Sequence, residues 1–290
     1  MLYICPRTRS AANSPKHRLP ARSVPGTGEF KTFADFRTEI MRIIDAAAEK
    51  GIPLRILGGA AIRMHCPGSE HLYDLLKRAP KHDMDFVSYS KYRPLTRQFM
   101  KDMGYTPYVT LAMTSGAGRH RQIFNDAEGN KAIDVFLDIL PMCHVIDFRG
   151  RLEADHPTVP PAELFLLKAQ ICEMNEKDWQ DMCILLREHS IGNADRDMIN
   201  LPHVANVLAD DWGFYHTVST NLKKLQDYVG QCPGLSGDDR KNIEGKITAI
   251  NEAIEKEPKT LKWKMRARIG TARKWYNVVE EVQRDTLSES

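Results

Sequence analysis

Three aspartates in apolar surroundings are the residues of this sequence best suited to metal chemistry. Asp83 and Asp85 stand two positions apart at the start of an apolar run, and Asp134 is centred in Ile133-Asp134-Val135. Side chains two apart on a strand point to one face, so the first two carboxylates should lie side by side, and the third could join them from a neighbouring strand. Mg²⁺ prefers such oxygen ligands, and a charge in an apolar strand is costly unless it is paired or metal-bound. The pattern predicts a divalent-metal site suited to phosphoryl transfer.

A glycine pair ahead of these acids could bring backbone groups to a phosphate. Residues 54–57 predict a short buried strand, Gly58 and Gly59 follow it, and a helix is expected from Ala60. Backbone N–H groups at such a strand-to-helix turn approach phosphate closely, helped by the helix N-terminus. The glycine pair alone is a weak signal. The ordered set of Gly-Gly, Asp-x-Asp and a single Asp in an apolar strand is much more specific.

The elements that must position these residues form two unlike halves. Apolar residues at three- and four-residue spacing predict a helix over 33–50, closed by Gly51. Further strands are expected at 84–89, 105–113, 119–125 and 131–140, and further helices at 70–78, 95–103, 164–171 and 179–186. From about 200 to 283 only helical segments are predicted. The expected fold class is α/β (α+β), a mixed sheet flanked by helices and followed by an all-helical C-terminal domain.

Composition narrows the classes of protein. Of 290 residues 42% are hydrophobic, enough for one large domain or two moderate ones. No apolar run approaches the roughly 20 residues that span a bilayer, so we expect no membrane association and a cytoplasmic location. The six cysteines are scattered without a C-x-x-C pair, which argues against a zinc ribbon and a disulfide framework.

The ordered motifs resemble those of the DNA polymerase β-like nucleotidyltransferase superfamily. The matching segments are Leu57-Gly58-Gly59-Ala60-Ala61, Lys81-His82-Asp83-Met84-Asp85-Phe86 and Ile133-Asp134-Val135. Within that superfamily the chain looks most like the AbiEii-type group, which includes toxins of toxin–antitoxin systems. That resemblance uses Lys131-Ala132-Ile133-Asp134, Phe165-Leu166-Leu167-Lys168-Ala169 and Lys177-Asp178-Trp179-Gln180-Asp181. The resemblance covers about 52–188, within a nucleotidyltransferase domain expected over 29–190. Residues 1–28 are rich in Pro, Ser, Ala and Arg without apolar periodicity and are expected to be a disordered leader, and the helical pattern predicts a helical domain over 191–290.

The resemblance implies a role for each matching residue. Asp83, Asp85 and Asp134 would hold Mg²⁺, in a site that could take two ions, and Asp134 would also help to deprotonate the incoming hydroxyl. Lys168 would contact the phosphates of the nucleotide, and Asp181 would lie near it and orient it. The glycine pair completes the nucleotide-binding set. Four basic residues could meet phosphate or be ordinary surface cations, and we assign the last two to nucleotide binding: Arg63, Arg78, Lys81 and Lys131.

The expected activity is transfer of a nucleoside monophosphate from an NTP to an acceptor hydroxyl. The toxin-like resemblance and a basic stretch over 259–274 favour an RNA end, tRNA in particular, as the acceptor, and make an antitoxin protein a candidate partner. Two departures from the family pattern are Gly59, where a serine is frequent, and a long gap between Gly59 and Asp83.

Other classes of protein fit parts of the pattern. A small-molecule adenylyltransferase of the antibiotic-modifying type and a catalytically silent nucleotide-binding module both stay open. The pair His82-Asp83 also occurs in HD-type phosphohydrolases, but that fold is helical and needs further histidines, whereas Asp83 begins an apolar strand. His144 and His156 have no partner at ligand spacing and are expected to be structural.

Overall fold

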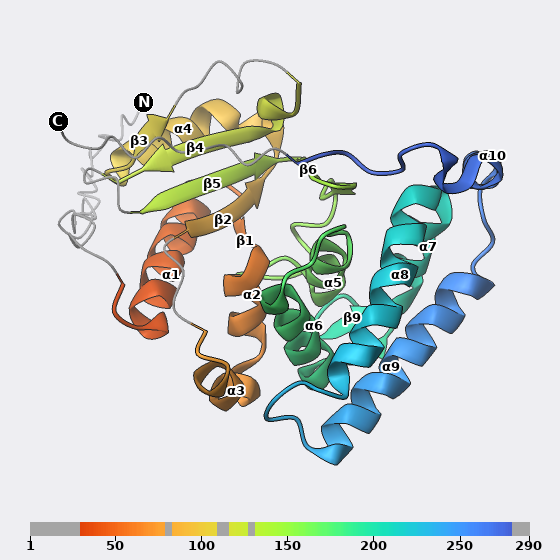
Figure 1. Cartoon of the computed structure of the whole chain (residues 1–290). Coiled ribbons are helices and arrows are strands. Elements are labelled where there is room, and N and C mark those ends of the chain that lie inside the picture. Colours follow the sequence, from red (N-terminus) through yellow and green to blue (C-terminus); the bar gives the residue numbers. More distant parts are fainter. Residues whose placement is uncertain (1–29, 79–82, 109–115, 127–130, 280–290) are drawn as a thin grey trace, which may run out of the picture.

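The computed structural model describes residues 30–78, 83–108, 116–126 and 131–279, so the predicted leader over 1–28 lies outside the described residues. Figure 1 shows a mixed sheet with helices on both sides, followed by a group of helices. The predicted fold class is confirmed. The strands are β1 (Arg55–Ile56), β2 (Asp83–Ser88), β3 (Thr106–Tyr108), β4 (Arg121–Asn125), β5 (Ala132–Leu137), β6 (Ile139–Pro141), β7 (Val145–Asp147), β8 (Ser190–Gly192) and β9 (Met198–Asn200). The α-helices are α1 (Phe33–Glu49), α2 (Gly58–His65), α3 (Glu70–Leu75), α4 (Arg93–Asp102), α5 (Pro161–Ala169), α6 (Glu176–Glu188), α7 (Leu201–Asp210), α8 (Trp212–Val229), α9 (Gly237–Lys256) and α10 (Leu261–Ile269).

The centre of the main sheet is a parallel pair of strands. The described strands have the order β1-β2-β5-β4-β3, and β6 and β7 continue from the end of β5. β2 and β5 run parallel, while β1-β2, β5-β4 and β4-β3 are antiparallel. Both central strands are rich in buried apolar residues, as expected for strands covered on both faces. The two strands that carry the aspartates are therefore held side by side in the middle of the sheet.

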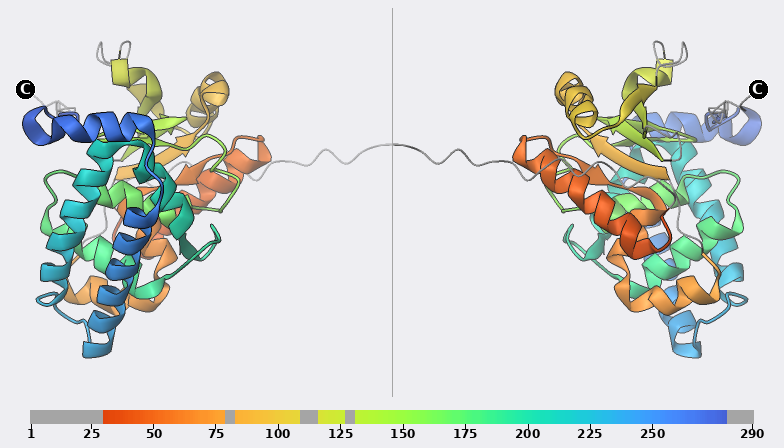
Figure 2. Two further views of the ribbon diagram at one scale, coloured as in Figure 1. Left: turned by 90° about the vertical axis from the view of Figure 1, so that its right-hand side faces the viewer. Right: turned by 90° about the vertical axis from the view of Figure 1, so that its left-hand side faces the viewer.

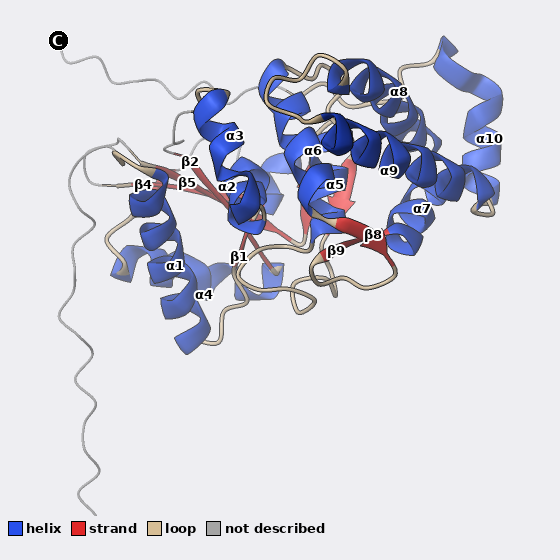
Figure 3. Cartoon of the chain, turned by 90° about the horizontal axis from the view of Figure 1, so that it is seen from below, coloured by secondary structure: helices blue, strands red, loops and turns tan. Residues whose placement is uncertain are grey.

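Helices cover the two faces of this sheet. Figure 3 shows α1 and α4 on one side and α2 and α3 on the other. α1 begins at a capping box in which Thr32 and Asp35 bond each other's backbone N–H groups. It buries Ile40, Ile43 and Ile44, the three- and four-residue spacing of an amphipathic helix. The predicted helix over 33–50 is confirmed at this place.

The predicted single strand over 131–140 is wrong in one respect, because the chain turns back within it. β5 ends at Leu137, and β6 pairs antiparallel with it from Ile139 onwards. Asp138 between them has a φ of +63°, and its Oδ1 accepts a hydrogen bond from the backbone N–H of Ser90 at 2.9 Å. Aspartate tolerates the left-handed region because its short side chain bonds locally. An apolar run alone gives no sign of such a turn.

A small parallel sheet, which the sequence did not indicate, lies between the two halves. Residues 190–192 of β8 pair with residues 198–200 of β9. The predicted domain boundary at 190/191 therefore falls within β8. α5 and α6 contact α2 on the side of the main sheet and also contact the later helices α8 and α9. The division into two domains stays a prediction.

The helical half is organised around α7, α8 and α9. Leu208, Leu222 and Ile247 from these three helices are fully buried in the same core that extends under the sheet. α10 lies across the ends of α7 and α8 and buries none of its own residues (Figure 2). Among the described residues, no helix combines the length and the apolar character needed to cross a membrane.

His144 connects the sheet to the helical half. Its backbone N–H donates to Oε1 of Gln170 at 3.0 Å, and its Nε2 lies 2.8 Å from Oγ1 of Thr217. Its ring stacks on Phe214 of α8, with ring centroids 4.9 Å apart. Burial lowers the pKa of His144 to about 4, so the ring is neutral in the folded protein at neutral pH.

We predict that His144 makes the protein sensitive to acid. As the pH falls from about 6.5 to about 4, the unfolded chain gains a proton on this ring that the folded protein does not take up, so the free energy of unfolding falls by up to about 3 kcal/mol. His144→Gln should reduce the slope of stability against pH, measured by urea unfolding across this range. The exposed His71→Gln should keep the parent slope, and equal slopes in all three proteins would contradict the prediction.

Candidate metal and nucleotide site

Asp83, Asp85 and Asp134 lie on one face of the central strand pair. In the parallel register Asp85 is directly beside Asp134, and Asp83 is beside Ala132. Neighbouring strands are about 4.8 Å apart, and residues two apart on one strand are separated by about 6.6 Å with their side chains on the same face. Asp134 is buried, Asp85 is half-buried and Asp83 is exposed. The three aspartates form a row of carboxylates that runs from solvent into the protein.

The start of α2 packs against this row. The helix begins at Gly58, two residues before the predicted start at Ala60, so both glycines belong to its first turn. Gly58 has a φ of +75°, and a Cβ there would lie 3.3 Å from Oδ2 of Asp85. Leu57 at the N-cap offers no side-chain hydrogen bond. The N–H groups of this first turn therefore lack a capping side chain, which leaves them suited to an anionic ligand.

The second glycine packs against a buried carboxylate of α6. A Cβ at Gly59 would lie 3.2 Å from Oδ2 of Asp181, whose side chain has no solvent exposure. Arg78, at the end of the segment that follows α3, donates to Oδ1 of Asp181 at 2.6 Å and to the backbone oxygen of Lys177 at 2.9 Å. Asp181 thus connects the first turn of α2 with Arg78.

Lys168 is buried between two carboxylates. Its Nζ lies 2.8 Å from Oδ1 of Asp178 and 2.8 Å from Oδ2 of Asp181. Burial alone would lower the pKa of this lysine, but the two aspartates outweigh it and raise the pKa of Lys168 above its ordinary value. The charged ammonium offsets part of the negative charge of the two acids. It reaches the first turn of α2 through Asp181, and its contact with nucleotide phosphate stays a prediction.

Arg121 of β4 supplies a cation on the face of the three aspartates. Its Nη2 donates to Oδ2 of Asp134 at 2.5 Å, and its guanidinium lies 5.4 Å from the ring centroid of Phe136. Ile123 is the register partner of Asp134, and Arg121 is two residues before it, so all three side chains share one face. Three-quarters of the arginine side chain is buried. Its charge offsets that of Asp134, the most buried aspartate of the row.

Of the two lysines assigned to the nucleotide, Lys131 is not brought to this row. Lys131 is three residues before Asp134, an odd offset that directs the two side chains to opposite faces. Its Nζ lies 4.4 Å from the ring centroid of Phe30, and Phe30 packs on Phe36 of α1. Lys131 is therefore buried on the α1 side of the sheet. Lys81 lies outside the described residues.

The residues present fit Mg²⁺ by chemical type and by placement. The donor set is made of carboxylates, two of them side by side in register and a third on the same face. The φ of Gly58 and the absence of a Cβ leave space in contact with Asp85, which a larger residue would fill. Among the described side chains, no three His, Cys, Asp or Glu groups already converge at metal-binding distances.

Two arginines of the site had little or no signal in the sequence. Arg121 stands in a strand that the pattern predicted, and a cation at an alternating position of an apolar strand was the available sign. Arg78 was left open between phosphate contact and an ordinary surface cation. Its partner Asp181 is 103 residues away in the chain, so only the fold reveals the pairing.

Comparisons with known proteins give loose structural neighbours. No family model matches the chain, and no curated protein matches it. The solution structure of the antibiotic-resistance factor ANT(2'')-Ia is 13% identical, covers 80% of this chain and 92% of its own, and has a TM-score of 0.29. A crystal structure of an antigenic nucleotidyltransferase-like protein from Paracoccidioides brasiliensis is also 13% identical, covers 77% of this chain and 94% of its own, and has a TM-score of 0.36.

We predict that Gly58 cannot be replaced without strain. In Gly58→Ala the new Cβ meets Asp85 and the left-handed backbone becomes unfavourable, so the free energy of unfolding should fall by about 1–2 kcal/mol. The matched control is Gly245→Ala in the middle of α9, where a Cβ has open space, and it should gain about 0.5–1 kcal/mol. Denaturant unfolding measures both, and an equal response of the two variants would refute the strained start of α2.

We also predict that Lys168 stabilises the fold whatever else it does. Lys168→Met leaves Asp178 and Asp181 buried without this cation and should cost about 3–5 kcal/mol. Adding Asp178→Asn should restore part of that loss, because it removes one of the two buried charges. Lys177→Met, at an exposed position of α6, the helix that carries the two aspartates, should change stability by no more than about 0.5 kcal/mol. No loss in Lys168→Met would show that the ion pairs contribute nothing.

Proposed function

We propose that this chain is a Mg²⁺-dependent nucleotidyltransferase that moves a nucleoside monophosphate from an NTP to the hydroxyl of an RNA end. The observation that carries the proposal is the register of β2 and β5, in which Asp85 lies beside Asp134 on the face that meets the first turn of α2. Carboxylates and helix N–H groups are then available to one ligand. A nucleoside triphosphate with its metal is the common ligand that needs both.

Each part of the site has a task in this reaction. Asp83, Asp85 and Asp134 would hold Mg²⁺, which when bound neutralises phosphate oxygens and aligns the reacting groups. The N–H groups at Gly58 and Gly59 would bind the phosphates of the NTP. These tasks match the positions that the sequence motifs occupy in the resembling family.

The transfer itself is a displacement at the α-phosphorus. The acceptor hydroxyl oxygen forms a bond to that phosphorus, and the bond to the bridging oxygen of the pyrophosphate breaks. Pyrophosphate leaves with the electron pair, and the hydroxyl proton passes to the Asp134 carboxylate. Arg121, bonded to Asp134, positions that carboxylate and balances its charge before the proton arrives.

The cations behind the site have a positioning role. Lys168 and Arg78 both bond Asp181, and Asp181 packs against Gly59. They therefore hold the first turn of α2 at a fixed distance from the aspartate row. The AbiEii-type resemblance implies that Lys168 also reaches phosphate, and this is part of the proposal.

RNA, and tRNA in particular, is the proposed acceptor, and an antitoxin protein is the proposed regulatory partner. Both come from the AbiEii-type resemblance of residues 131–134, 165–169 and 177–181. The basic segment over 259–274 adds support for a polyanionic acceptor, since it contains seven Lys and Arg residues and no acid.

The test is incorporation of label from each α-labelled NTP into total RNA and cell extract with Mg²⁺. We expect Asp85→Asn and Asp134→Asn to lower incorporation by about a hundredfold or more, because each removes a ligand that acts on the transition state. Asp45→Asn, at an exposed position of α1, is the matched control and should keep the parent rate. Chelation of Mg²⁺ should abolish incorporation in every protein.

Other outcomes would replace the proposal. Full incorporation by Asp85→Asn would exclude the aspartate row as the catalytic centre. Label in small molecules of the extract, with none in RNA, would indicate an adenylyltransferase of the antibiotic-modifying type. A rise in Tm with Mg²⁺ and NTP but no labelled product would indicate a nucleotide-binding module.

A further inference from the structure

The charge of the chain is concentrated in one segment near its C-terminal end. Residues 259–279 contain seven cationic side chains and no acid: Lys259, Lys262, Lys264, Arg266, Arg268, Arg273 and Lys274. The whole chain has a net charge of +3, so the rest sums to −4 (+3 minus +7). A strongly cationic segment in a chain whose remainder is net acidic points to a polyanion as the ligand of that segment.

The segment forms a continuous surface with two parts. α10 lies across the ends of α7 and α8, and residues 273–279, which we call the strap, run from it back to the sheet beside β6 (Figure 1). Asn277 anchors the strap, since its backbone N–H donates to the oxygen of Cys143 at 2.9 Å and its side chain donates to the oxygen of Met142 at 3.2 Å. The surface thus leads from the far end of the helical half toward the sheet that carries the aspartates.

The cations of this surface are available to a ligand. Lys264, Arg268, Arg273 and Lys274 are exposed. Within residues 30–78, 83–108, 116–126 and 131–279, none of these four has a carboxylate within 4.0 Å, whereas Lys262 pairs with Asp210 at 3.0 Å. Four exposed cations close in sequence repel one another, and a bound polyanion relieves that repulsion.

The half-buried Arg266 holds the two parts of this surface together. The guanidinium of Arg266 lies 4.9 Å from the ring centroid of Trp212. It also donates to the backbone oxygens of Gly270 at 2.8 Å and Arg273 at 2.8 Å. Arg266 therefore fixes the turn between α10 and the strap, and with it the positions of the exposed cations on either side.

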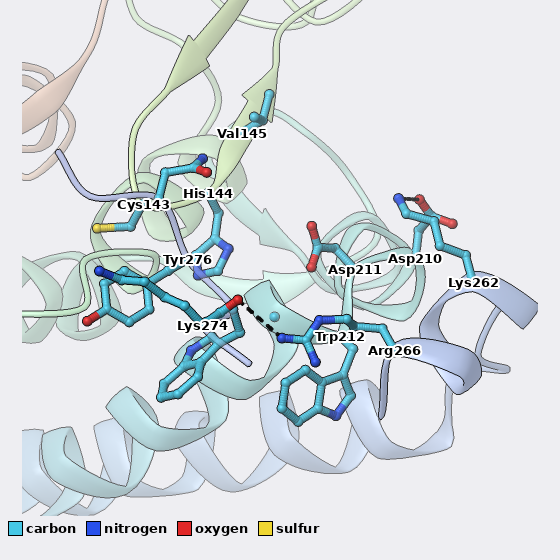
Figure 4. Close-up of a pocket in the computed structure, with 13 residues that line it drawn as sticks. Cys143, His144, Val145, Asp210, Asp211, Trp212, Lys262, Arg266, Lys274 and Tyr276 are labelled. Atoms are coloured by element: carbon cyan, nitrogen blue, oxygen red, sulfur yellow. Dashed lines mark hydrogen bonds and ion pairs between the residues drawn. The ribbon is translucent and has the colours of Figure 1, made fainter. Parts of the chain in front are cut away.

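A cavity with aromatic walls opens under the strap. It has a volume of about 360 Å³ and lies between the start of α8, α10, the strap and the turn before β7 (Figure 4). Trp212, Trp275 and Tyr276 line it together with Asp210 and Asp211, and Lys274 lies 4.9 Å from the ring centroid of Tyr276. Aromatic rings next to cations are the features by which proteins bind single-stranded nucleic acid, because every base offers a face for stacking.

We propose that α10 and the strap bind single-stranded RNA, with a base at the aromatic cavity and phosphates on the exposed cations. The choice of RNA rests on the proposed function. An anionic membrane surface suits the same charges less well, because the apolar residues on the outer side of α10 are few. They are Leu261, Met265 and Ile269 on a helix of nine residues, while membrane-surface helices bury a larger apolar face. The strap adds two exposed apolar side chains, Val278 and Val279.

The test compares two triple variants of the full chain that remove the same charge. Arg268→Gln/Arg273→Gln/Lys274→Gln alters the proposed surface. The matched control, Lys223→Gln/Lys224→Gln/Lys241→Gln, alters exposed lysines of α8 and α9. The probe is a labelled single-stranded RNA of about 16 nucleotides, followed by fluorescence anisotropy over a KCl series. The surface variant should bind about tenfold more weakly or worse. The negative slope of its log K against log salt should become shallower by about 2.

The results distinguish RNA binding by this surface from lipid binding and from a failure of the proposed transfer. The control should bind within about twofold of the parent chain, and equal binding by the surface variant would overturn the proposal. Loss of binding to phosphatidylserine vesicles, with RNA binding unchanged, would overturn it in favour of a lipid surface. A parent chain that binds RNA through this surface but transfers no nucleotide would disprove the proposed function alone.

Discussion

Carboxylates gathered around one helix start repel one another, and the surrounding structure holds them in place. Asp85 and Asp134 lie side by side in register, and Asp181 lies against the adjacent glycine. Each has a cost in free energy because a buried or partly buried charge loses its water. Arg121 offsets Asp134, while Arg78 and Lys168 offset Asp181. The cations come from β4, from the segment after α3 and from α5, so the site depends on three elements meeting the parallel strand pair.

The sequence predicted the row of aspartates because it follows from short-range rules. Alternation on a strand puts Asp83 and Asp85 on one face, and the apolar neighbours of Asp134 mark it as unusual. The pairing of β2 with β5 was beyond those rules. Asp85 and Asp134 are 49 residues apart, and their register depends on the whole sheet. The same reason hides Arg78 and Arg121, whose partners are fixed by packing rather than by spacing.

Errors in the predicted elements occurred where a side chain or a tight turn overrides an apolar pattern. The strand expected over 131–140 breaks at Asp138, whose carboxylate bonds the backbone of Ser90 and so favours the left-handed turn. β8 and β9 are three residues each, too short for a periodic signal to emerge. The odd offset between Lys131 and Asp134 was visible in the sequence, and it already implied that the two side chains leave opposite faces of the strand.

The start of α2 lacks a stabilising cap, and the proposed binding of phosphate gives a reason for that lack. A Ser, Thr, Asp or Asn at the N-cap would stabilise the helix by about 1 kcal/mol, yet Leu57 stands there and Gly58 adds a left-handed backbone. A capping side chain would occupy the N–H groups that a phosphate needs, and a Cβ would occupy the space beside Asp85. The cost is tolerable because Asp181, held by Lys168 and Arg78, fixes the next residue of the same turn. The buried ion pairs of Asp181 with Lys168 and Arg78 therefore help to hold a first turn that has no side-chain cap.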